Sequence, residues 1–316
     1  MDKIMSSWIC RASPNIALIK YMGKCDGNIP SNVSISHTLE DFYSEVSMEL
    51  IHGDDDIFIN NMELTPAAVE RFLQHFRYIK SLMNFHGNFS LTSRNNFPHS
   101  VGIASSASSF AALTICAFRA ICAITAVPLP SMEYMSGVSR RASGSSCRSF
   151  FAPWSIWQSE TAKKIDLKIG QLRHNIIFVN TVAKKVLSSE AHQRVPSSLL
   201  FAGRAARAQK RCKQLLAALN STDESGWPMA YQICWEEFWD MHALFETSSP
   251  SFGYMQPGTI SVLLFLQDFW KFHGDGPLVT IDAGPNVHLL WRMDQKNLQN
   301  RCVLYLRDAL IVPNSQ

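Results

Sequence analysis

Two serine-rich stretches of this sequence combine small side chains with hydroxyl groups in a pattern that can bind phosphate. The first, Asn95 to Phe110, places a proline and Gly102 before four serines, and these serines open an apolar run. If that run is a helix, its unpaired N–H groups and positive dipole end form an anion site. An ordinary serine N-cap would explain one serine easily and four poorly. The second stretch, Ala142 to Ser149, surrounds Gly144 with hydroxyl residues and contains Arg148.

Four charged side chains could act on a phosphate compound bound there. Lys20, Lys24 and Arg148 are cations, and Asp282 is a carboxylate beside the apolar Ile281. Several cations together with two phosphate-type loops indicate a substrate and a cosubstrate that both carry phosphate. A single carboxylate suits a base or an aligning group for one hydroxyl. These residues favour phosphoryl transfer from ATP, whose catalysis is mostly positioning and charge neutralisation. The residues by themselves lead no further.

Other common catalytic and metal-binding motifs do not occur in the sequence. It lacks a Walker A motif, G-x-G-x-x-G, H-E-x-x-H and zinc-type spacing of cysteine and histidine. The three aspartates at 54–56 fit a solvated hairpin turn better than a metal site. His242 has apolar neighbours, and we expect it to be a satisfied core residue rather than a ligand.

The elements that must position these residues follow from hydrophobic periodicity. The apolar run after the serines predicts a buried helix over 110–127 whose first turn is the serine cluster. Further helices are predicted over 65–85, 131–141, 197–219, 231–245, 258–272 and 297–310. Strands are predicted over 8–11, 29–39, 43–50, 57–60, 89–92 and 175–180, the last continuing through 185–192. A β-hairpin over 278–291 places Asp282 at the end of a buried strand.

Length, composition and charge describe a folded protein with a sizeable core. The chain has 316 residues, 47% of them hydrophobic and 17% charged, enough for one large or two medium domains. Its net charge of +3 argues mildly against generic nucleic-acid binding. The basic residues between Arg204 and Lys213 lack interleaved aromatics, so a solvated helix face is the favoured interpretation and a nucleic-acid patch the alternative.

The cysteines and the long apolar run bear on where the protein works. Eight cysteines lie far apart without C-x-x-C spacing, and no signal peptide precedes them, which predicts reduced thiols in a cytoplasmic protein. The run over 110–127 is short for a membrane span, Ala-rich and interrupted by Arg119, so a core helix is the better interpretation.

Four blocks of the sequence carry a resemblance to a known family. They are N-I-A-L-I-K-Y-M-G-K with the following I-P-S-N-V-S-I-S-H-T-L, N-N-F-P-H-S-V-G-I-A-S-S-A-S-S-F-A-A-L, S-G-S-S-C-R-S-F-F, and I-D-A-G-P-N. In this order they resemble the diphosphomevalonate decarboxylases of the GHMP kinase superfamily, over nearly the whole chain. The serine-rich block alone indicates only the superfamily, and the other blocks point to the decarboxylases.

The resemblance implies a role for each matching residue. Asp282 matches the aspartate that orients or deprotonates the C3 hydroxyl, Arg148 the arginine that grips the departing carboxylate, and Lys20 the lysine near the transferred phosphate. Residues implied to bind the substrate, mevalonate 5-diphosphate, are Tyr21, Lys24, Ser145, Arg148 and a serine pair on a mobile loop, Ser188 and Ser189. Residues implied to bind ATP are Asn96, Pro98, Gly102, Ser105, Ser106 and Ser108, and Ser106 is also the implied Mg²⁺ ligand.

This chain departs from the family pattern at four places without losing a reacting group. Met22 stands where the family has Trp, Ala142 where it has Gly, and Ala152-Pro153 where it has Gly-Gly. Ala191-His192 replaces the usual Gly-Met after the serine pair. The departures bear on loop closure and on how the substrate fits, including how many phosphates it carries.

The resemblance also implies an architecture and an activity. The expected fold is α+β of GHMP kinase type. An N-terminal α/β domain over 1–174, like domain 2 of ribosomal protein S5, would bind ATP. A ferredoxin-like domain over 175–316 would face the substrate, and its final strands and helix could pack back on the first domain. The implied reaction is ATP-dependent decarboxylation of mevalonate 5-diphosphate to isopentenyl diphosphate in a cytoplasmic homodimer, with no nucleic-acid or membrane partner.

Two alternatives to this activity stay open. One is a related decarboxylase or 3-kinase that acts on mevalonate 5-phosphate or on mevalonate. The other is a catalytically dead relative that binds nucleotide. The intact Lys20, Arg148 and Asp282 argue against the second alternative.

Overall fold

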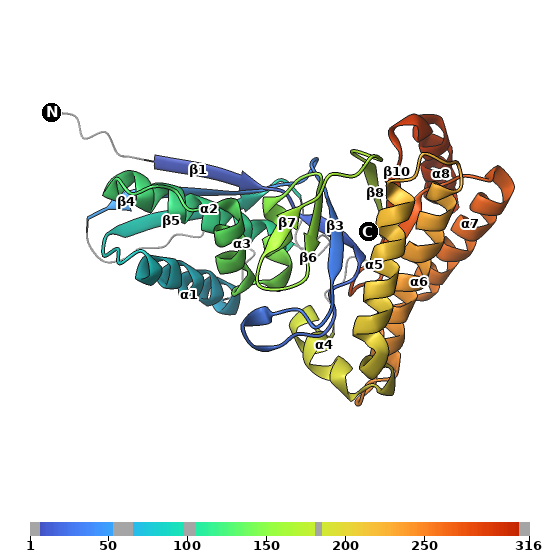
Figure 1. Ribbon diagram of the computed structural model, residues 1–316, viewed down its shortest axis with the longest axis horizontal. Coiled ribbons are helices and arrows are strands. Elements are labelled where there is room, and N and C mark those ends of the chain that lie inside the picture. Colours follow the sequence, from blue (N-terminus) through green and yellow to red (C-terminus); the bar gives the residue numbers. More distant parts are fainter. Residues whose placement is uncertain (1–6, 53–65, 98–104, 181–184, 310–316) are drawn as a thin grey trace, which may run out of the picture.

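The computed structural model describes residues 7–52, 66–97, 105–180 and 185–309 and shows an α+β protein with three antiparallel sheets. The strand orders are β1-β4-β5, β2-β3-β6-β7 and β8-β10-β9. The first two sheets lie in the N-terminal half, and the third lies among the helices of the C-terminal half (Figure 1). The predicted fold class is thereby confirmed.

The first sheet and two helices build the N-terminal core. Strands β1 (Ser7–Ala12), β4 (Ser44–Ile51) and β5 (Asn88–Asn95) pair in register, and helices α1 (Pro66–Leu82) and α2 (Ser105–Thr125) pack with them in one apolar cluster. The helix α2 is long and apolar enough to cross a membrane, but 83% of its apolar window is buried inside the protein. This confirms the prediction of a core helix that begins in the serine cluster.

The second sheet leads the chain into Lys20, which directly follows its strand β2. Its strands are β2 (Asn15–Ile19), β3 (Ser34–Thr38), β6 (Trp154–Trp157) and β7 (Ala162–Lys164). Both β2 and β3 are buried along their whole length, because helices cover the faces that an isolated sheet would leave to water. Helix α3 (Met132–Arg140) and a 3-10 segment, Gly144–Phe150, follow α2 and lead the chain into β6.

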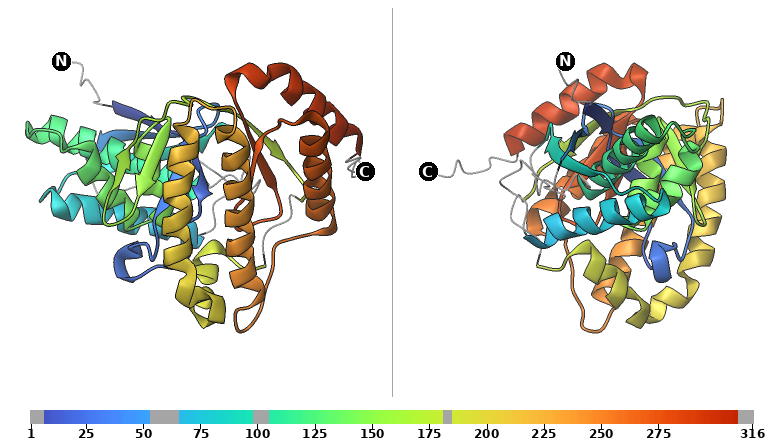
Figure 2. Two further views of the ribbon diagram at one scale, coloured as in Figure 1. Left: turned by 45° about the vertical axis from the view of Figure 1, so that its right-hand side comes forward. Right: turned by 90° about the vertical axis from the view of Figure 1, so that its left-hand side faces the viewer.

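The C-terminal half consists of the third sheet and a set of helices. Its strands are β8 (Arg173–Ile177), β9 (Leu278–Ile281) and β10 (Val287–Trp291), and β9 and β10 form the predicted hairpin. Its helices are α4 (Ser188–Arg194), α5 (Arg204–Leu219), α6 (Gly226–Glu246), α7 (Pro257–His273) and α8 (Lys296–Ala309). Figure 2 shows α5 and α6 standing beside the N-terminal strands, with α7 and α8 farther out.

The two halves share a core across the predicted boundary at residue 174. Leu18 and Trp154 of the second sheet belong to the same buried cluster as Cys212 and Leu215 of α5 and Cys234 of α6. Burial of these side chains holds α5 and α6 against β2, the strand that leads to Lys20. The division into two domains stays a prediction.

Some sequence predictions need correction. The helix predicted over 197–219 begins at Arg204, after two short 3-10 turns, and the strand predicted over 29–39 covers only Ser34–Thr38. The segment 185–192, predicted to continue a strand, instead contains the start of α4. The aspartates at 54–56 and the strand predicted over 57–60 lie outside the described residues.

Candidate active site

A short ion pair joins the two halves of the molecule at the centre of the site. Lys20 immediately follows β2 and is 1% exposed, and its Nζ lies 2.5 Å from Oδ1 of Asp282, immediately after β9. Burial lowers the pKa of Lys20, and the Asp282 carboxylate opposes that shift. Burial would raise the pKa of Asp282, but the charges of Lys20, His288 and Arg148 outweigh it and lower the pKa. Pairing with Lys20 therefore favours the carboxylate form of Asp282.

The backbone of Lys20 is held by a second, fully buried ion pair. Glu237 of α6 accepts a hydrogen bond from the Lys20 backbone N–H at 2.9 Å, and Arg204 of α5 donates to the Lys20 carbonyl at 3.1 Å. Arg204 and Glu237 also pair with each other, and both are at most 1% exposed. Because donor and acceptor are both fixed, the lysine leaves β2 in one direction only.

The arginines of α5 correct the expectation of a solvated face. Arg207 and Arg211 join Arg204 in binding acidic residues of α6, with Asp240 reached by all three. Positions 204, 207 and 211 lie on one side of a helix, which here packs on α6. This part of the basic cluster is internal ion pairing, and Lys210 and Lys213 alone of the cluster are exposed.

Arg148 is buried, and two of its three guanidinium nitrogens donate hydrogen bonds to neighbouring side chains. Its Nε donates to Asn15 Oδ1 at 3.1 Å and its Nη1 to Ser34 Oγ at 2.9 Å, and the group lies 5.4 Å from the centre of the Trp157 ring. None of the described residues accepts a hydrogen bond from Nη2. Burial lowers the pKa of Arg148, and Asp282 is among the groups that oppose this. The remaining nitrogen suits a carboxylate.

The two serine-rich stretches meet through their hydroxyl groups. Ser143 Oγ lies 3.4 Å from Ser106 Oγ in the first turn of α2 and 3.4 Å from Ser145 Oγ in the arginine segment. Ser106 is exposed and Ser145 half-buried, so both can meet a ligand. The start of α2 and the segment bearing Arg148 thus border one region, as two phosphate-type loops acting on one reaction would require.

The other residues predicted to bind ATP differ in their exposure and in their contacts. Ser105 is half-buried in the first turn of α2, whereas Ser108 is fully buried and its hydroxyl contacts Ser44 Oγ at 2.6 Å. The Asn96 amide oxygen accepts from the Tyr43 backbone N–H at 2.7 Å, so this side chain ties β5 to the turn before β4. Pro98 and Gly102 lie outside the described residues.

Tyr21, predicted to bind substrate, packs between two aromatic rings. Its ring centre lies 4.5 Å from that of Trp157 and 4.3 Å from that of His192. A Cβ at position 144 would lie 2.7 Å from the Tyr21 hydroxyl oxygen, which explains why a glycine stands there. Burial raises the pKa of Tyr21, so the hydroxyl stays protonated and can donate a hydrogen bond.

The remaining residues predicted to bind substrate are Lys24, which follows Tyr21 in the chain, and two serines on α4, the helix whose His192 contacts Tyr21. Lys24 is half-buried and donates to Asn28 Oδ1 at 2.9 Å. Ser188 and Ser189 are exposed in the first turn of α4, a helix where a mobile loop was expected. They stand four and three residues before His192 and therefore share its face of the helix.

The described side chains offer no ready-made metal site. Nowhere in residues 7–52, 66–97, 105–180 and 185–309 do three His, Cys, Asp or Glu side chains gather to hold an ion. Mg²⁺ in nucleotide enzymes keeps several waters and is held largely by substrate phosphates. The Ser106 hydroxyl, exposed in the first turn of α2, fits such an ion as a single protein ligand.

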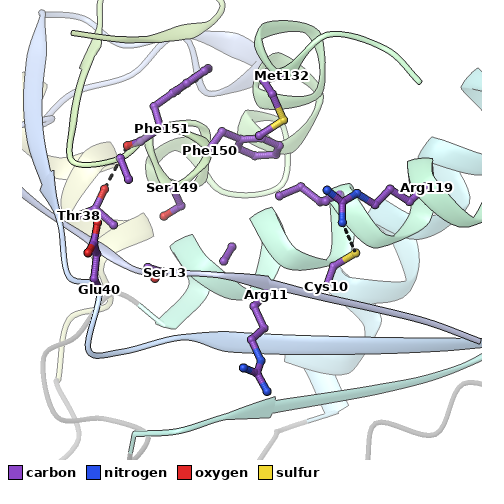
Figure 3. A pocket seen from close by; sticks show the side chains of 13 residues that line it. Cys10, Arg11, Ser13, Thr38, Glu40, Arg119, Met132, Ser149, Phe150 and Phe151 are labelled. Carbon is purple, nitrogen blue, oxygen red and sulfur yellow. Dashed lines mark hydrogen bonds between the residues drawn. The ribbon is translucent and has the colours of Figure 1, made fainter. Parts of the chain in front are cut away.

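The N-terminal half also contains a pocket of about 410 Å³ (Figure 3). It is lined by β1, by the middle of α2 and by the chain around Phe150, with Cys10 and Arg119 on one wall. Lys20, Arg148 and Asp282 do not line it, so it is a separate feature from the site assembled here.

Sequence reasoning missed several residues that shape the site. Asn15 and Ser34 hold Arg148, and Glu237 holds Lys20. The signal for Glu237 was the spacing of acidic residues on α6 opposite a row of arginines on α5. The sequence marks His192 only as a departure from the family pattern. His242 is buried, as expected of a core residue, and its Nε2 lies 3.2 Å from the Asp282 carbonyl oxygen, but its Nδ1 has no hydrogen-bond partner among the described residues, so the ring is not fully satisfied.

Comparisons with known proteins find relatives of one family. The family model described as the diphosphomevalonate decarboxylase-like N-terminal domain matches residues 12–167. A crystal structure of a mevalonate diphosphate decarboxylase from Legionella pneumophila is 42% identical, covers 98% of this chain and 99% of its own, and superposes with a TM-score of 0.88.

More distant relatives point the same way. A diphosphomevalonate decarboxylase from Aspergillus fumigatus is 28% identical, over 87% of this chain and 74% of its own length. A structure of MDDEF in complex with MVAPP, AMPPCP and magnesium is 26% identical, covers 95% of this chain and 93% of its own, and has a TM-score of 0.84.

Proposed function

This chain belongs to the diphosphomevalonate decarboxylase family, and from that premise we propose that it converts mevalonate 5-diphosphate and ATP to isopentenyl diphosphate, ADP, phosphate and CO₂. The observation that carries the proposal is the 2.5 Å pair of Lys20 and Asp282, with the charge of Arg148 acting on the same carboxylate. A kinase needs only the first two groups, whereas a decarboxylase also needs a cation for the substrate's carboxylate.

Asp282 is suited to align the C3 hydroxyl toward the phosphoryl group. Its pKa lies below the ordinary value, so it is a carboxylate that accepts the hydroxyl hydrogen bond and is a weak base before the reaction begins. As the bond from the hydroxyl oxygen to the γ-phosphorus of ATP forms, the bond from that phosphorus to the bridging oxygen breaks and ADP leaves with the electron pair. The hydroxyl proton becomes acidic during this step and passes to the carboxylate. Lys20 stands beside the transferred group and offsets its charge.

The second stage breaks two bonds and makes one. The C3–O bond of the phosphorylated substrate breaks and phosphate takes the electron pair, so C3 gains positive charge. The bond between C2 and the carboxylate carbon then breaks, its electrons form the C2–C3 double bond, and CO₂ leaves. Arg148, fixed by Asn15 and Ser34, orients the carboxylate. A rigid single contact orients this group without over-stabilising it relative to the transition state.

ATP and Mg²⁺ are assigned to the region where the serine stretches meet. We place the phosphates at the start of α2, with Ser105 and Ser106 as hydroxyl donors and Ser106 as the protein ligand of the ion. A bound Mg²⁺ would neutralise charge on the phosphate oxygens. The support is the exposure of Ser106 at a helix N-terminus beside Ser143 and Ser145.

We also propose that the protein is a cytoplasmic homodimer. All eight cysteines are free thiols, a state that reducing compartments maintain. Phe272 and Leu264 of α7 are 85% and 57% exposed, and Tyr305 of α8 is 59% exposed. These apolar side chains suit a contact with a second copy, and sedimentation of the purified protein tests the assembly.

An assay of purified protein with Mg·ATP decides the reaction. We expect ADP and CO₂ in equal amounts from mevalonate 5-diphosphate, and much less turnover of the 5-phosphate or of mevalonate. ADP without CO₂ would make the protein a 3-kinase, and equal products from the 5-phosphate would transfer the activity to that substrate.

A further inference from the structure

His192 on α4 is fixed against the substrate side of the site by two contacts. Its Nδ1 accepts a hydrogen bond from the Gly23 backbone N–H at 3.0 Å, and its ring centre lies 4.3 Å from that of Tyr21. Figures 1 and 2 show α4 beside the turn that follows β2, the segment containing Tyr21 and Lys24. The imidazole is thus held by the same segment of chain that carries two predicted substrate residues.

The Gly23 contact decides which ring nitrogen carries the proton. A neutral imidazole has one donor and one acceptor, so an Nδ1 that accepts leaves the hydrogen on Nε2. Burial, with Lys24 and Arg148, lowers the pKa of His192 to about 3, so the ring is neutral at pH 7. Among the described residues, none accepts a hydrogen bond from its Nε2. The side chain is half-buried, so this N–H keeps access to solvent or ligand.

The surroundings of His192 select an anion as the partner for that N–H. Lys24 and Arg148 are near enough for their charges to act on the ring. Ser188 and Ser189 lie on the same face of α4 and are exposed. A region with two cations, two hydroxyls and an unused N–H donor, and no carboxylate acting on the ring, favours a group with several oxygen acceptors.

We propose that His192 is a specificity-determining residue that donates a hydrogen bond from Nε2 to a non-bridging oxygen of the substrate's diphosphate. The inference rests on the proposed function, because it assigns the diphosphate to the region of Tyr21 and Lys24. The Met that the family pattern places there has no such donor. This chain would thereby replace contacts made elsewhere in the family with an imidazole fixed by its own backbone.

Two substitutions separate the two nitrogens of the ring. His192→Asn keeps an acceptor at the Nδ1 position for Gly23 but loses the distal donor, whereas His192→Gln places an amide N–H near Nε2 and loses the Gly23 acceptor. We expect His192→Asn to raise KM for mevalonate 5-diphosphate about ten- to a hundredfold, with kcat and KM for ATP within about twofold. His192→Gln should recover part of the loss. The exposed His86→Asn serves as the matched control and should change nothing.

Calorimetric titration with inorganic pyrophosphate separates this inference from the proposed function. If the unmodified protein fails to turn over mevalonate 5-diphosphate, the function fails, yet weaker pyrophosphate binding by His192→Asn still supports the contact. Unchanged pyrophosphate affinity together with unchanged KM would overturn it, leaving the ring a packing group against Tyr21. A fall in kcat alone, or failure of both variants to fold, would equally overturn it.

Discussion

Lys20 takes part in two ion-pair groups that differ in how completely their charges are satisfied. Its side chain pairs with Asp282, which is 31% exposed, and its backbone is held by Glu237 and Arg204, which are 0% and 1% exposed. Arg204 also binds Asp240, so each charge of the group on α5 and α6 has an ion-pair partner, although the buried Arg204 Nε has no hydrogen-bond partner among the described residues. Asp282 keeps one face open. We call Lys20 and Asp282 the open pair, and Arg204, Glu237 and Asp240 with the other arginines of α5 the closed group. The open pair can gain a partner from substrate, whereas the closed group can only hold the backbone of Lys20 in place.

This difference in exposure predicts different roles for Asp282 and Glu237. Buried charges that lose a partner destabilise a fold strongly, because the remaining charge stays in a medium of low polarity. A pair that borders solvent is stabilised less by its partner, and its charges remain available to a ligand. We therefore expect substitution of Asp282 to affect the rate chiefly, and substitution of Glu237 to affect the fold chiefly.

The largest effect should follow Asp282→Asn. Asparagine keeps the shape but has no charge to align the C3 hydroxyl or to take its proton, and loss of a positioned base reduces rates about 10²–10⁴-fold. We expect kcat to fall at least about a hundredfold. The free energy of unfolding should also fall, because the buried Lys20 ammonium loses its charged partner, but by less than in Glu237→Gln, where the carboxylate accepts from three donors. Steady-state kinetics and urea unfolding of the same preparations measure both.

The exposed Asp268→Asn provides the control for this change and should leave both quantities unaltered. A folded Asp282→Asn protein that keeps most of its turnover would remove Asp282 from the mechanism. It would also erase the contrast between the open pair and the closed group.

Glu237→Gln should produce the next largest effect, in stability. Glu237 accepts from Arg204, Arg211 and the Lys20 backbone, and the neutral amide leaves the Arg204 guanidinium short of charge in the core. Breaking a buried pair typically destabilises by about 3–5 kcal/mol. Urea unfolding should show a loss of this order, whereas Glu236→Gln, at a side chain 49% exposed, should stay within about 0.5 kcal/mol of the unmodified protein. Equal losses from both variants would show that the closed group adds nothing.

The open and closed groups also differ in how well the sequence predicted them. Asp282 was predicted because it follows an apolar strand and opens a Gly-Pro turn, a local pattern that the β9–β10 hairpin confirms. The buried helix α2 followed from the length and composition of its apolar run. Both the hairpin and the helix are determined by residues close together in the chain, so the sequence pattern predicts them.

What the sequence could not supply were contacts between distant segments. The pairing of Glu237 with the backbone of Lys20 joins residues 217 positions apart. Arg204 was interpreted as solvated because its helix is basic, and only the packing of α5 on α6 shows why the charge lies inside. The sequence does not reveal the α4 helix, because its seven residues, which begin with Ser188 and Ser189, are too few to show a helical period.

A smaller effect, on substrate binding rather than on the chemical step, is expected from substitution of Lys24. Removing one charge-assisted contact to a phosphate costs about 1.5–3 kcal/mol, or roughly ten- to over a hundredfold in affinity. Lys24→Ala should therefore raise KM for mevalonate 5-diphosphate with little change in kcat. Steady-state kinetics beside the exposed control Lys210→Ala decides the matter. An unchanged KM would place Lys24 outside the substrate contacts.

The smallest effect is the loss of stability at low pH that Asp240 of the closed group should cause. Burial would raise the pKa of Asp240, but hydrogen bonds from Arg207 and Arg211 and the charge of Arg204 outweigh this and lower the pKa to about 2. Because the folded pKa is below the unfolded value of about 3.9, this carboxylate stabilises the fold above about pH 4. That stabilisation, on the order of 1–2 kcal/mol, is lost as the pH falls toward 2. Urea unfolding between pH 2 and 6 measures it.

Asp240→Asn shows whether this pH dependence belongs to the closed group. The variant cannot titrate at position 240, so its free energy of unfolding should be lower than that of the unmodified protein at pH 6, and the gap should close toward pH 2. Asp268, 78% exposed beside Lys271, provides a surface carboxylate for comparison, and Asp268→Asn should follow the unmodified protein throughout. A gap that stays constant with pH would mean that Asp240 acts by shape and packing, and Arg204 would then hold the Lys20 carbonyl without help from the charge of Asp240.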